Sequence, residues 1–142
     1  MKKKLLILMM ILCLLMTPLA AWADSAAYSN GETVMPRYTT VAGINTIFNI
    51  VDGTAQGAVT VQRRTANPFD YSKITVYLKK SSGTTVKTWT ATKYPTAGGS
   101  FTWSDSYDLT SKGTYYLEAK NKLYQDDELI ETITTTSVYR TY

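Results

Sequence analysis

The strongest constraint on the fold is an alternation of apolar and polar side chains that recurs in short segments along the chain. In residues 73–80, Ile74, Val76 and Leu78 occupy every second position, and lysine, threonine and tyrosine stand between them. Side chains of a β-strand point alternately to the two faces of a sheet, so this pattern predicts a half-buried strand. No segment keeps the i, i+3, i+4, i+7 apolar spacing of an amphipathic helix for three turns. The pattern therefore favours an all-β protein.

Seven such segments are separated by turn-forming residues. Residues 24–142 contain 22 threonines and 11 tyrosines, two residue types that are enriched in strands. Short strands at close spacing, without helices between them, are typical of an antiparallel sandwich or barrel. The first strand is expected to bend at Gly43, and the last to contain a bulge. The predicted strands are residues 37–51, 58–65, 73–80, 85–92, 100–109, 114–124 and 129–139.

The first 23 residues have the layout of a helical secretory signal peptide. Three lysines at positions 2–4 precede a 12-residue run, 5–16, that is apolar apart from one cysteine. As a helix this run is about 18 Å long, which is short of the roughly 30 Å core of a bilayer. This length favours a cleaved leader over an uncleaved membrane anchor. The residues expected to define the cleavage site are Ala21, Ala23 and, as the first residue of the mature chain, Asp24.

Three segments follow from this interpretation: a signal peptide (1–23), a polar lead-in (24–36) and one folded domain (37–142). The product is expected to be secreted, with no membrane association after cleavage. Residues 24–142 carry 12 Lys and Arg against 11 Asp and Glu, because three of the 15 basic residues lie in the leader. A domain with a net charge of +1 gives no support to a nucleic-acid partner.

Catalytic chemistry is restricted by two missing residue types. The only cysteine, Cys13, lies in the leader, and the chain has no histidine. A mature domain of this composition has no disulfide, thiolate nucleophile, histidine base or usual set of zinc ligands. A glycosidase needs only two carboxylates, but a small sandwich has little material for the required cleft. We therefore expect a protein that is not an enzyme and needs no cofactor.

One motif points to a particular kind of sandwich. Leu109, Gly113 and Tyr115 have the spacing of the tyrosine corner that leads into strand F of immunoglobulin-like and fibronectin-III-like domains. The chain as a whole resembles a group of small secreted proteins of Gram-positive bacteria that are classed as a domain of unknown function. This resemblance implies an immunoglobulin-like β-sandwich and export, and it carries no activity. The segments that carry it are Met35-Pro36-Arg37-Tyr38, residues 74–80, Val86-Lys87-Thr88-Trp89 and Gly113-Thr114-Tyr115-Tyr116.

A candidate binding surface follows from the alternation. If Ile74 and Leu78 point inward, Tyr77 points outward, and the same reasoning applies to the segment that contains Tyr115. Strands C and F are neighbours in immunoglobulin-like sandwiches, so the outward side chains of both segments should share one face. Exposed tyrosines suit contacts with proteins or sugar rings, although they are also common as simple strand formers. The predicted surface consists of Tyr77, Lys79, Tyr116, Lys120 and Tyr124.

Several functional alternatives remain at this point. The leading hypothesis is a secreted interaction module whose partner is an extracellular protein or a cell-wall glycan. A carbohydrate-binding module that uses Tyr77, Tyr116 and Trp89 is the first alternative, although Trp89 and Trp103 also fit the core. A bacteriocin-like effector and a small hydrolase are others. The acidic segment Asp126-Asp127-Glu128, with Glu131 nearby, lacks the spacing of a calcium loop and favours a solvated hairpin turn.

Overall fold

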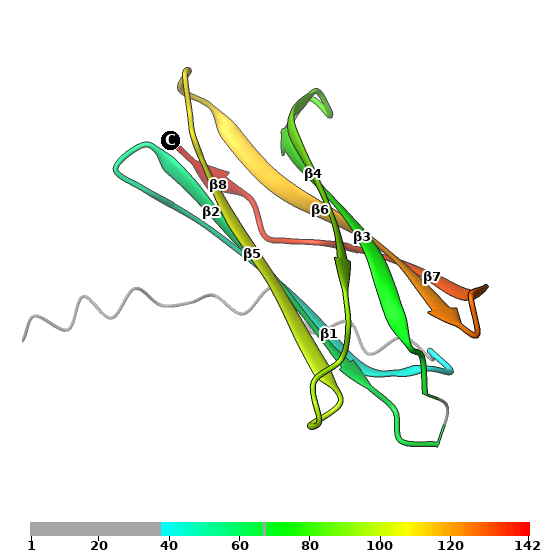
Figure 1. The fold of residues 1–142 in the computed structure, drawn as a ribbon. Helices are drawn as coiled ribbons and strands as arrows, with labels where there is room; N and C mark the ends of the chain where they lie inside the picture. Colours follow the sequence, from blue (N-terminus) through cyan, green and yellow to red (C-terminus); the bar gives the residue numbers. More distant parts are fainter. Residues whose placement is uncertain (1–37, 67) are drawn as a thin grey trace, which may run out of the picture.

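The computed structural model describes residues 38–66 and 68–142, and in this part of the chain it contains eight β-strands and no helix (Figure 1). No helix there has the length and hydrophobicity needed to cross a membrane. The predicted signal peptide, its cleavage site and the lead-in lie outside the described residues. The strands are β1 (Val41–Val51), β2 (Thr54–Arg63), β3 (Tyr71–Lys80), β4 (Thr85–Lys93), β5 (Ser100–Asp108), β6 (Thr114–Gln125), β7 (Glu128–Thr136) and β8 (Arg140–Thr141).

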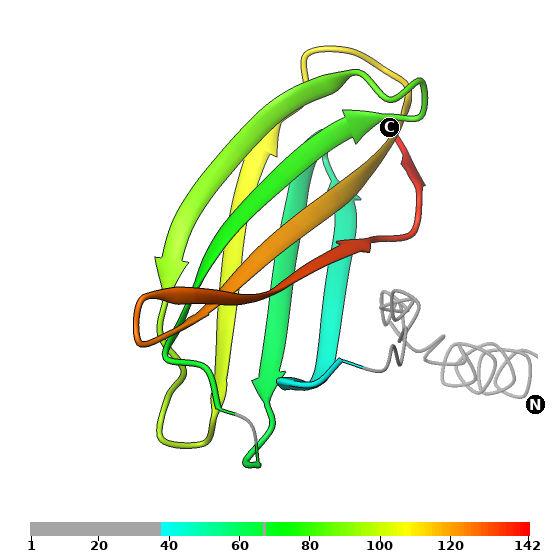
Figure 2. The same cartoon turned by 90° about the vertical axis from the view of Figure 1, so that its right-hand side faces the viewer.

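The strands form two antiparallel sheets that face each other, and the predicted sandwich is confirmed. One sheet has the order β1-β2-β5, and the other has the order β4-β3-β6-β7, with β8 paired to the start of β6. Figure 2 looks onto the five-stranded sheet, and the three-stranded sheet lies behind it. β3 and β6 are neighbours, as expected for strands C and F of an immunoglobulin-like sandwich. Seven of the eight strands correspond to predicted segments.

The core lies between the sheets and follows the predicted alternation. Ile74, Val76 and Leu78 of β3 are buried, and the residues between them point outward. On β6 the inward residues include Tyr115, Leu117 and Leu123, each at most 1% exposed. Apolar side chains that leave water on both sheets supply the main driving force for this packing. The other buried hydrophobic residues are Val41, Ile44, Phe48, Ala55, Val59, Val61, Phe69, Phe101, Trp103, Leu109, Ala119 and Ile133.

The starts of β1 and β2 differ from the prediction, and local backbone chemistry sets the start of β2. β2 begins at Thr54 and not at residue 58, since Asp52 and Gly53 both have positive φ angles, 49° and 82°. Two such residues form a tight hairpin turn, so pairing resumes at once with Val51 opposite Thr54. β1 begins at Val41 and not at residue 37, and a shift in register between Val41 and Gly43 marks the predicted bend.

The last strand contains the predicted bulge and ends earlier than expected. Asp126 and Asp127 form a tight turn with φ angles of 49° and 63°, and the register then shifts so that Ile130 is the extra residue. β7 ends at Thr136, three residues before the predicted end. Ser137 causes this, because its Oγ accepts the hydrogen bond of Leu117 N at 2.9 Å in place of a backbone carbonyl. The chain then leaves the sheet and returns as β8.

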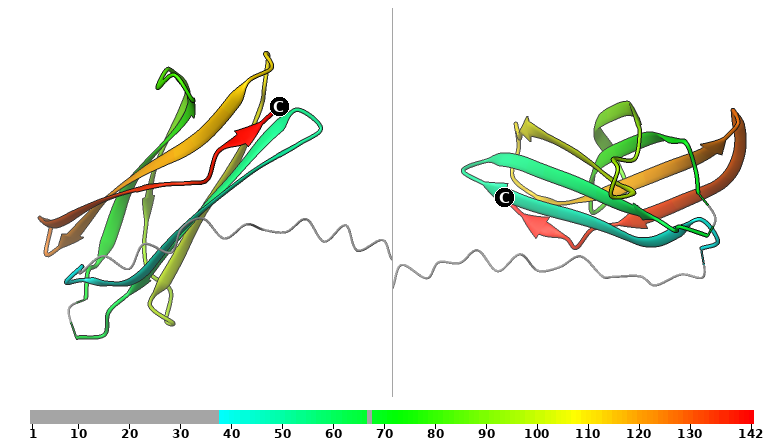
Figure 3. Two further views of the ribbon diagram at one scale, coloured as in Figure 1. Left: turned by 180° about the vertical axis from the view of Figure 1, so that it is seen from behind. Right: turned by 60° about the horizontal axis from the view of Figure 1, so that its bottom comes forward.

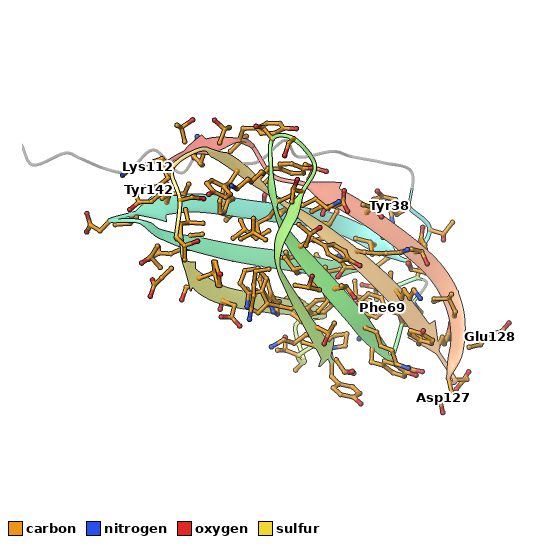
Figure 4. All side chains as sticks on the ribbon, turned by 90° about the horizontal axis from the view of Figure 1, so that it is seen from above. Tyr38, Phe69, Lys112, Asp127, Glu128 and Tyr142 are labelled. Atoms are coloured by element: carbon orange, nitrogen blue, oxygen red, sulfur yellow. The ribbon has the colours of Figure 1, made fainter. Side chains whose placement is uncertain are left out.

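The last residue of the chain closes one end of the sandwich. Tyr142 exchanges two backbone hydrogen bonds with Gly113, and the Lys112 ammonium lies 3.5 Å from the centre of the Tyr142 ring. Figure 4 labels Lys112 and Tyr142 beside each other, and Figure 3 shows this terminus next to the β1–β2 hairpin. The Tyr142 hydroxyl fills the space over Gly53, where a Cβ atom would be only 2.8 Å away.

Gly57 of β2 provides a direct test of the core packing. A Cβ atom at this position would overlap Leu117 Cδ1, and Leu117 is only 1% exposed and has little room to move. We expect Gly57→Ala to lower the free energy of unfolding by about 1 to 3 kcal/mol, the usual cost of overpacking. Urea unfolding followed by tryptophan fluorescence would measure it. The control is Gly43→Ala in β1, where no atom lies within 4 Å, with an expected change of about 0.5 kcal/mol or less. Equal stability of the two variants would contradict the packing described.

Candidate functional site

The outer face of the five-stranded sheet carries all five residues of the predicted binding surface. β3 and β6 run antiparallel in continuous register from Tyr71 opposite Tyr124 to Lys80 opposite Tyr115. In a sheet every second residue shares a face, so the outward residues of the two strands form rows across the sheet. Tyr77, Lys79, Tyr116, Lys120 and Tyr124 all lie in these outward rows.

The five residues do not form one cluster, however. Tyr77, Lys79 and Tyr116 meet at one end of the face, where Lys79 pairs with Tyr116 and Tyr77 with Glu118. Lys120 lies near the middle, and Tyr124 lies at the other end. Since two rows lie between the row of Tyr77 and the row of Tyr124, the surface is an extended strip and not a single pocket.

At the first end of the strip the lysine already has a carboxylate partner. Lys79 Nζ lies 2.8 Å from Glu118 Oε1 and 5.4 Å from the centre of the Tyr77 ring. The hydrogen bond to Glu118 raises the pKa of Lys79 above its usual value. Tyr116 contacts Tyr139 with ring centres 4.9 Å apart. The lysine and Tyr116 at this end of the strip are therefore already paired with other residues of the protein.

The other end is an aromatic cluster that the sequence reasoning partly missed. Tyr71 and Tyr124 stack with ring centres 4.9 Å apart, and Tyr94 lies 5.7 Å from Tyr71. The Lys73 ammonium lies 4.8 Å from the centre of the Tyr124 ring. Tyr71 and Lys73 have the same alternation phase as Tyr77, and this signal could have placed them on the surface. Tyr71 was lost because the predicted strand began two residues too late.

Between the two ends lie two adjacent rows that hold lysines and threonines. One row contains Lys73 opposite Lys122, and the next contains Thr75 opposite Lys120. A threonine flanks each row on both sides. Thr92 of β4 and Thr132 of β7 flank the first row, and Thr90 of β4 and Thr134 of β7 flank the second. We call these eight residues the lysine–threonine rows.

A shallow hollow of about 620 Å³ opens over part of these rows, between β4, β3 and β6. Its polar lining comes from two lysines, three threonines and one tyrosine, and it includes no Asp or Glu. The residues that line it are Lys73, Ile74, Thr75, Thr90, Ala91, Thr92, Lys122 and Tyr124.

Trp89 does not belong to this face. It pairs with the buried Val76, and its ring packs edge-on against Trp103 with ring centres 5.5 Å apart. Trp103 is 4% exposed, so the prediction of a core tryptophan is confirmed there, and Trp89 is half-buried against it. The suggested use of Trp89 beside Tyr77 as a sugar platform is therefore wrong, because the two side chains point to opposite sides of the sheet.

The acidic hairpin tip is joined to residues 70 and 71, at the start of β3, by two hydrogen bonds. Asp70 Oδ2 accepts a hydrogen bond from Asp126 N at 2.8 Å, and Tyr71 donates its hydroxyl to Asp127 Oδ1 at 2.9 Å. The bond to Asp127 raises the pKa of Tyr71 above its usual value. Within the described ranges, no three Asp, Glu, His or Cys residues come close enough together to hold a metal ion. Figure 4 shows Asp127 and Glu128 at the outer end of the β6–β7 hairpin.

Glu131 lies close to this turn in sequence but points elsewhere. Its carboxylate accepts hydrogen bonds from Thr40 N at 3.2 Å, from Thr39 N at 3.4 Å and from the Thr40 hydroxyl. Partial burial, and to a lesser degree the charge of Glu131, raise the pKa of Tyr38. Glu131 therefore fastens the segment before β1 to β7, and no pattern in the sequence predicts this role.

The tyrosine corner has the expected geometry. Tyr115 is buried and donates its hydroxyl to Ser111 O at 2.7 Å, four residues earlier. Leu109 packs into the core, and Gly113 takes a φ of 148° that suits a residue without a Cβ atom. The corner stabilises the entry into β6 and takes no part in the outer face.

Two consecutive arginines where β2 ends also have a structural role. Arg63 Nη1 donates to Phe69 O at 3.2 Å, and Arg64 Nε donates to Val41 O at 3.0 Å. Both side chains brace the backbone where β2 leaves the sheet.

Comparisons with known proteins give a distant structural likeness. No family model matches the chain, and no curated protein matches its sequence. The β-sandwich is structurally similar to part of a protein described as a "putative beta-galactosidase" from Bacteroides fragilis, with a TM-score of 0.43 and 15% sequence identity. The alignment covers 66% of this chain and spans only 15% of the Bacteroides fragilis chain.

Proposed function

We propose that the chain is a secreted, non-enzymatic binding module of the cell envelope, and that the outer face of the five-stranded sheet is its binding surface. The observation that carries this proposal is the pair of lysine–threonine rows beside an open hollow. Lys73 and Lys122 lie directly opposite each other, and like charges in that position destabilise a sheet. A ligand that contacts both lysines would offset this cost.

The outer face of the three-stranded sheet is a weaker candidate. Its central rows hold small or uncharged side chains, such as Ile47 opposite Ala58 and Thr60 opposite Thr102. The Thr60 and Thr102 hydroxyls bond to each other at 3.0 Å. The hollow on this face measures about 160 Å³, compared with about 620 Å³ on the other.

The proposal that the partner is extracellular is based on the sequence. The leader-like segment at positions 1–23 supports export. The resemblance to small secreted Gram-positive proteins with an immunoglobulin-like fold supports an extracellular partner. A fold of this kind serves many functions, so the proposal depends on the surface and not on the fold.

The test compares two outward threonines at the centres of the two sheets. Thr75 lies on β3 between β4 and β6, and Thr60 lies on β2 between β1 and β5. Tryptophan is tolerated in strands, so both variants should fold. When the purified protein is mixed with insoluble cell walls of the producing organism, we expect most of it to leave solution. Thr75→Trp should reduce this retention several-fold by blocking the hollow, and Thr60→Trp should behave as the unmodified protein.

Two results would contradict the proposal. If the unmodified protein stays in solution, it is a diffusible product and not an envelope-binding module. If Thr75→Trp and Thr60→Trp are retained equally, the binding surface lies elsewhere on the molecule. Circular dichroism of each variant checks that its β-structure is intact.

A further inference from the structure

We infer that the ligand of the lysine–threonine rows is an acidic polysaccharide, a carbohydrate polymer that carries carboxylates; this inference rests on the proposed function. The rows combine two chemistries on one face. Three ammonium groups select for negative charge, and five hydroxyl groups select for a partner that is rich in hydroxyls.

The charge of the face is unbalanced, unlike that of the domain. Residues 38–142 hold eleven Lys and Arg against nine Asp and Glu, so the domain as a whole is close to neutral. In the outward rows of β3 and β6, four lysines stand against one carboxylate, Glu118, which is already paired with Lys79. That ion pair is the only one in the described part of the chain. Lys73, Lys120 and Lys122 therefore have no carboxylate partner there, and they lie in adjacent rows where one polyanion can reach all three.

The position of Lys73 suits a preformed anion site. Its ammonium lies 4.8 Å from the centre of the Tyr124 ring and 6.0 Å from that of Tyr71. An aromatic ring attracts an ammonium group without neutralising its charge. The stacked pair of tyrosines thus holds Lys73 at the edge of the hollow, and less ordering is needed when an anion binds.

The five threonines favour a polysaccharide over a protein. Thr75, Thr90, Thr92, Thr132 and Thr134 make no side-chain hydrogen bond within the described residues, so their hydroxyls can bond to a ligand. Protein interfaces have an apolar, aromatic centre that is poor in charge. Here the centre of the face is polar, and the exposed apolar side chains lie at its two ends, Tyr94 and Leu129 at one and Tyr139 beside Tyr116 at the other.

The aromatic cluster argues against a single-stranded nucleic acid. Such partners bind through bases that stack on open aromatic faces. The rings of Tyr71 and Tyr124 are within 6° of parallel and stack on each other, so one face of each ring is closed to a base. Tyr94 also packs against Tyr71, and the Lys73 ammonium lies over the Tyr124 ring. The lysine–threonine rows also contain no arginine, the side chain best suited to bidentate phosphate contacts.

The test measures binding of the purified protein to soluble polymers by affinity electrophoresis. The probes are polygalacturonate, alginate and hyaluronan as acidic polysaccharides, dextran as a neutral one, and single-stranded DNA as another polyanion. We expect retardation by at least one acidic polysaccharide and none by dextran. Raising the salt concentration to about 0.5 M should abolish it, because screening is strong at that ionic strength.

Two variants with the same change in charge locate the site. Lys73→Gln with Lys122→Gln removes the opposed pair, and we expect binding about tenfold weaker or worse. The control, Lys87→Gln with Lys93→Gln, removes two lysines from β4 that pair with the buried Leu78 and Ser72 and so lie outside the outward rows. This control should bind as the unmodified protein does.

Each other result overturns the inference. Equal losses in the two double variants would mean that only net charge matters. Binding to dextran as strong as to the acidic polymers, or tighter binding to DNA, would exclude an acidic polysaccharide as the ligand. Retention on cell walls without affinity for any acidic polymer would leave the proposed function standing and this inference wrong. If the protein neither is retained on cell walls nor binds an acidic polymer, the proposed function and this inference are both wrong.

Discussion

Replacing Leu117 by alanine is expected to lower the free energy of unfolding by about 3 to 5 kcal/mol, the upper part of the range for buried leucines. Leu117 lies on β6, is 1% exposed and fills the space over Gly57 of the opposite sheet. Gly57 has no side chain that could move into the cavity left by the substitution. Because Gly57 cannot fill the cavity, most of the cavity volume should persist, and the loss of unfolding free energy should be near the upper limit. Urea unfolding of the purified protein would measure the loss.

Leu129→Ala is the matched control for this prediction. Leu129 is the same residue type on the neighbouring strand β7, but it is 47% exposed. We expect its replacement to change the free energy of unfolding by about 1 kcal/mol or less. Similar losses for Leu117→Ala and Leu129→Ala would mean that the two sheets do not pack together at Gly57 as described.

Glu131→Ala is expected to cost about 2 to 4 kcal/mol, because it leaves buried donors without an acceptor. Thr40 is 6% exposed, and both its backbone N–H and its hydroxyl donate to the Glu131 carboxylate. The same carboxylate accepts from Thr39 N. Glu131 thus connects the start of β1, in one sheet, to β7, in the other. The change would be measured by urea unfolding and by the hydrogen exchange of the first β1 amides.

Two further variants separate this contact from a general effect of charge. Glu128→Ala removes an exposed carboxylate from the same strand, and we expect a change of about 0.5 kcal/mol or less. Glu131→Gln keeps one oxygen acceptor, so its loss should lie between those of the two alanine variants. A loss for Glu131→Ala no larger than that for Glu128→Ala would show that the contact does not hold β1.

The fold could be predicted from the sequence because the patterns that specify it involve residues close together in the chain. The alternation of Ile74, Val76 and Leu78 assigns one face of β3 to the core, and the spacing of Gly113 and Tyr115 marks the entry into β6. Both signals depend on residues a few positions apart, where the geometry of a strand or corner is fixed. The ends of strands were harder to predict. β2 begins early because Asp52 accepts a positive φ, a property that the residue type permits but does not require.

The candidate site could be predicted only in part, because it depends on register. The alternation placed Tyr77 and Lys79 on an outward face, but it did not show that Lys73 lies opposite Lys122, 49 positions later. A register shift of one residue would send either side chain to the other face. The Glu131 contact joins residues 91 positions apart through a polar side chain, and no periodic pattern marks such a pair.

The most direct test of the proposed binding surface is a map of amide chemical shifts. Isotope-labelled protein would be titrated with soluble fragments released from the cell wall. The structure predicts that the perturbed amides gather in the lysine–threonine rows, around Lys73, Thr75, Thr90 and Lys122, while those of β1 and β2 stay unchanged. Perturbations centred on β1 and β2, or their absence at saturating fragment concentration, would contradict the assignment of the outer face of the five-stranded sheet as the binding surface.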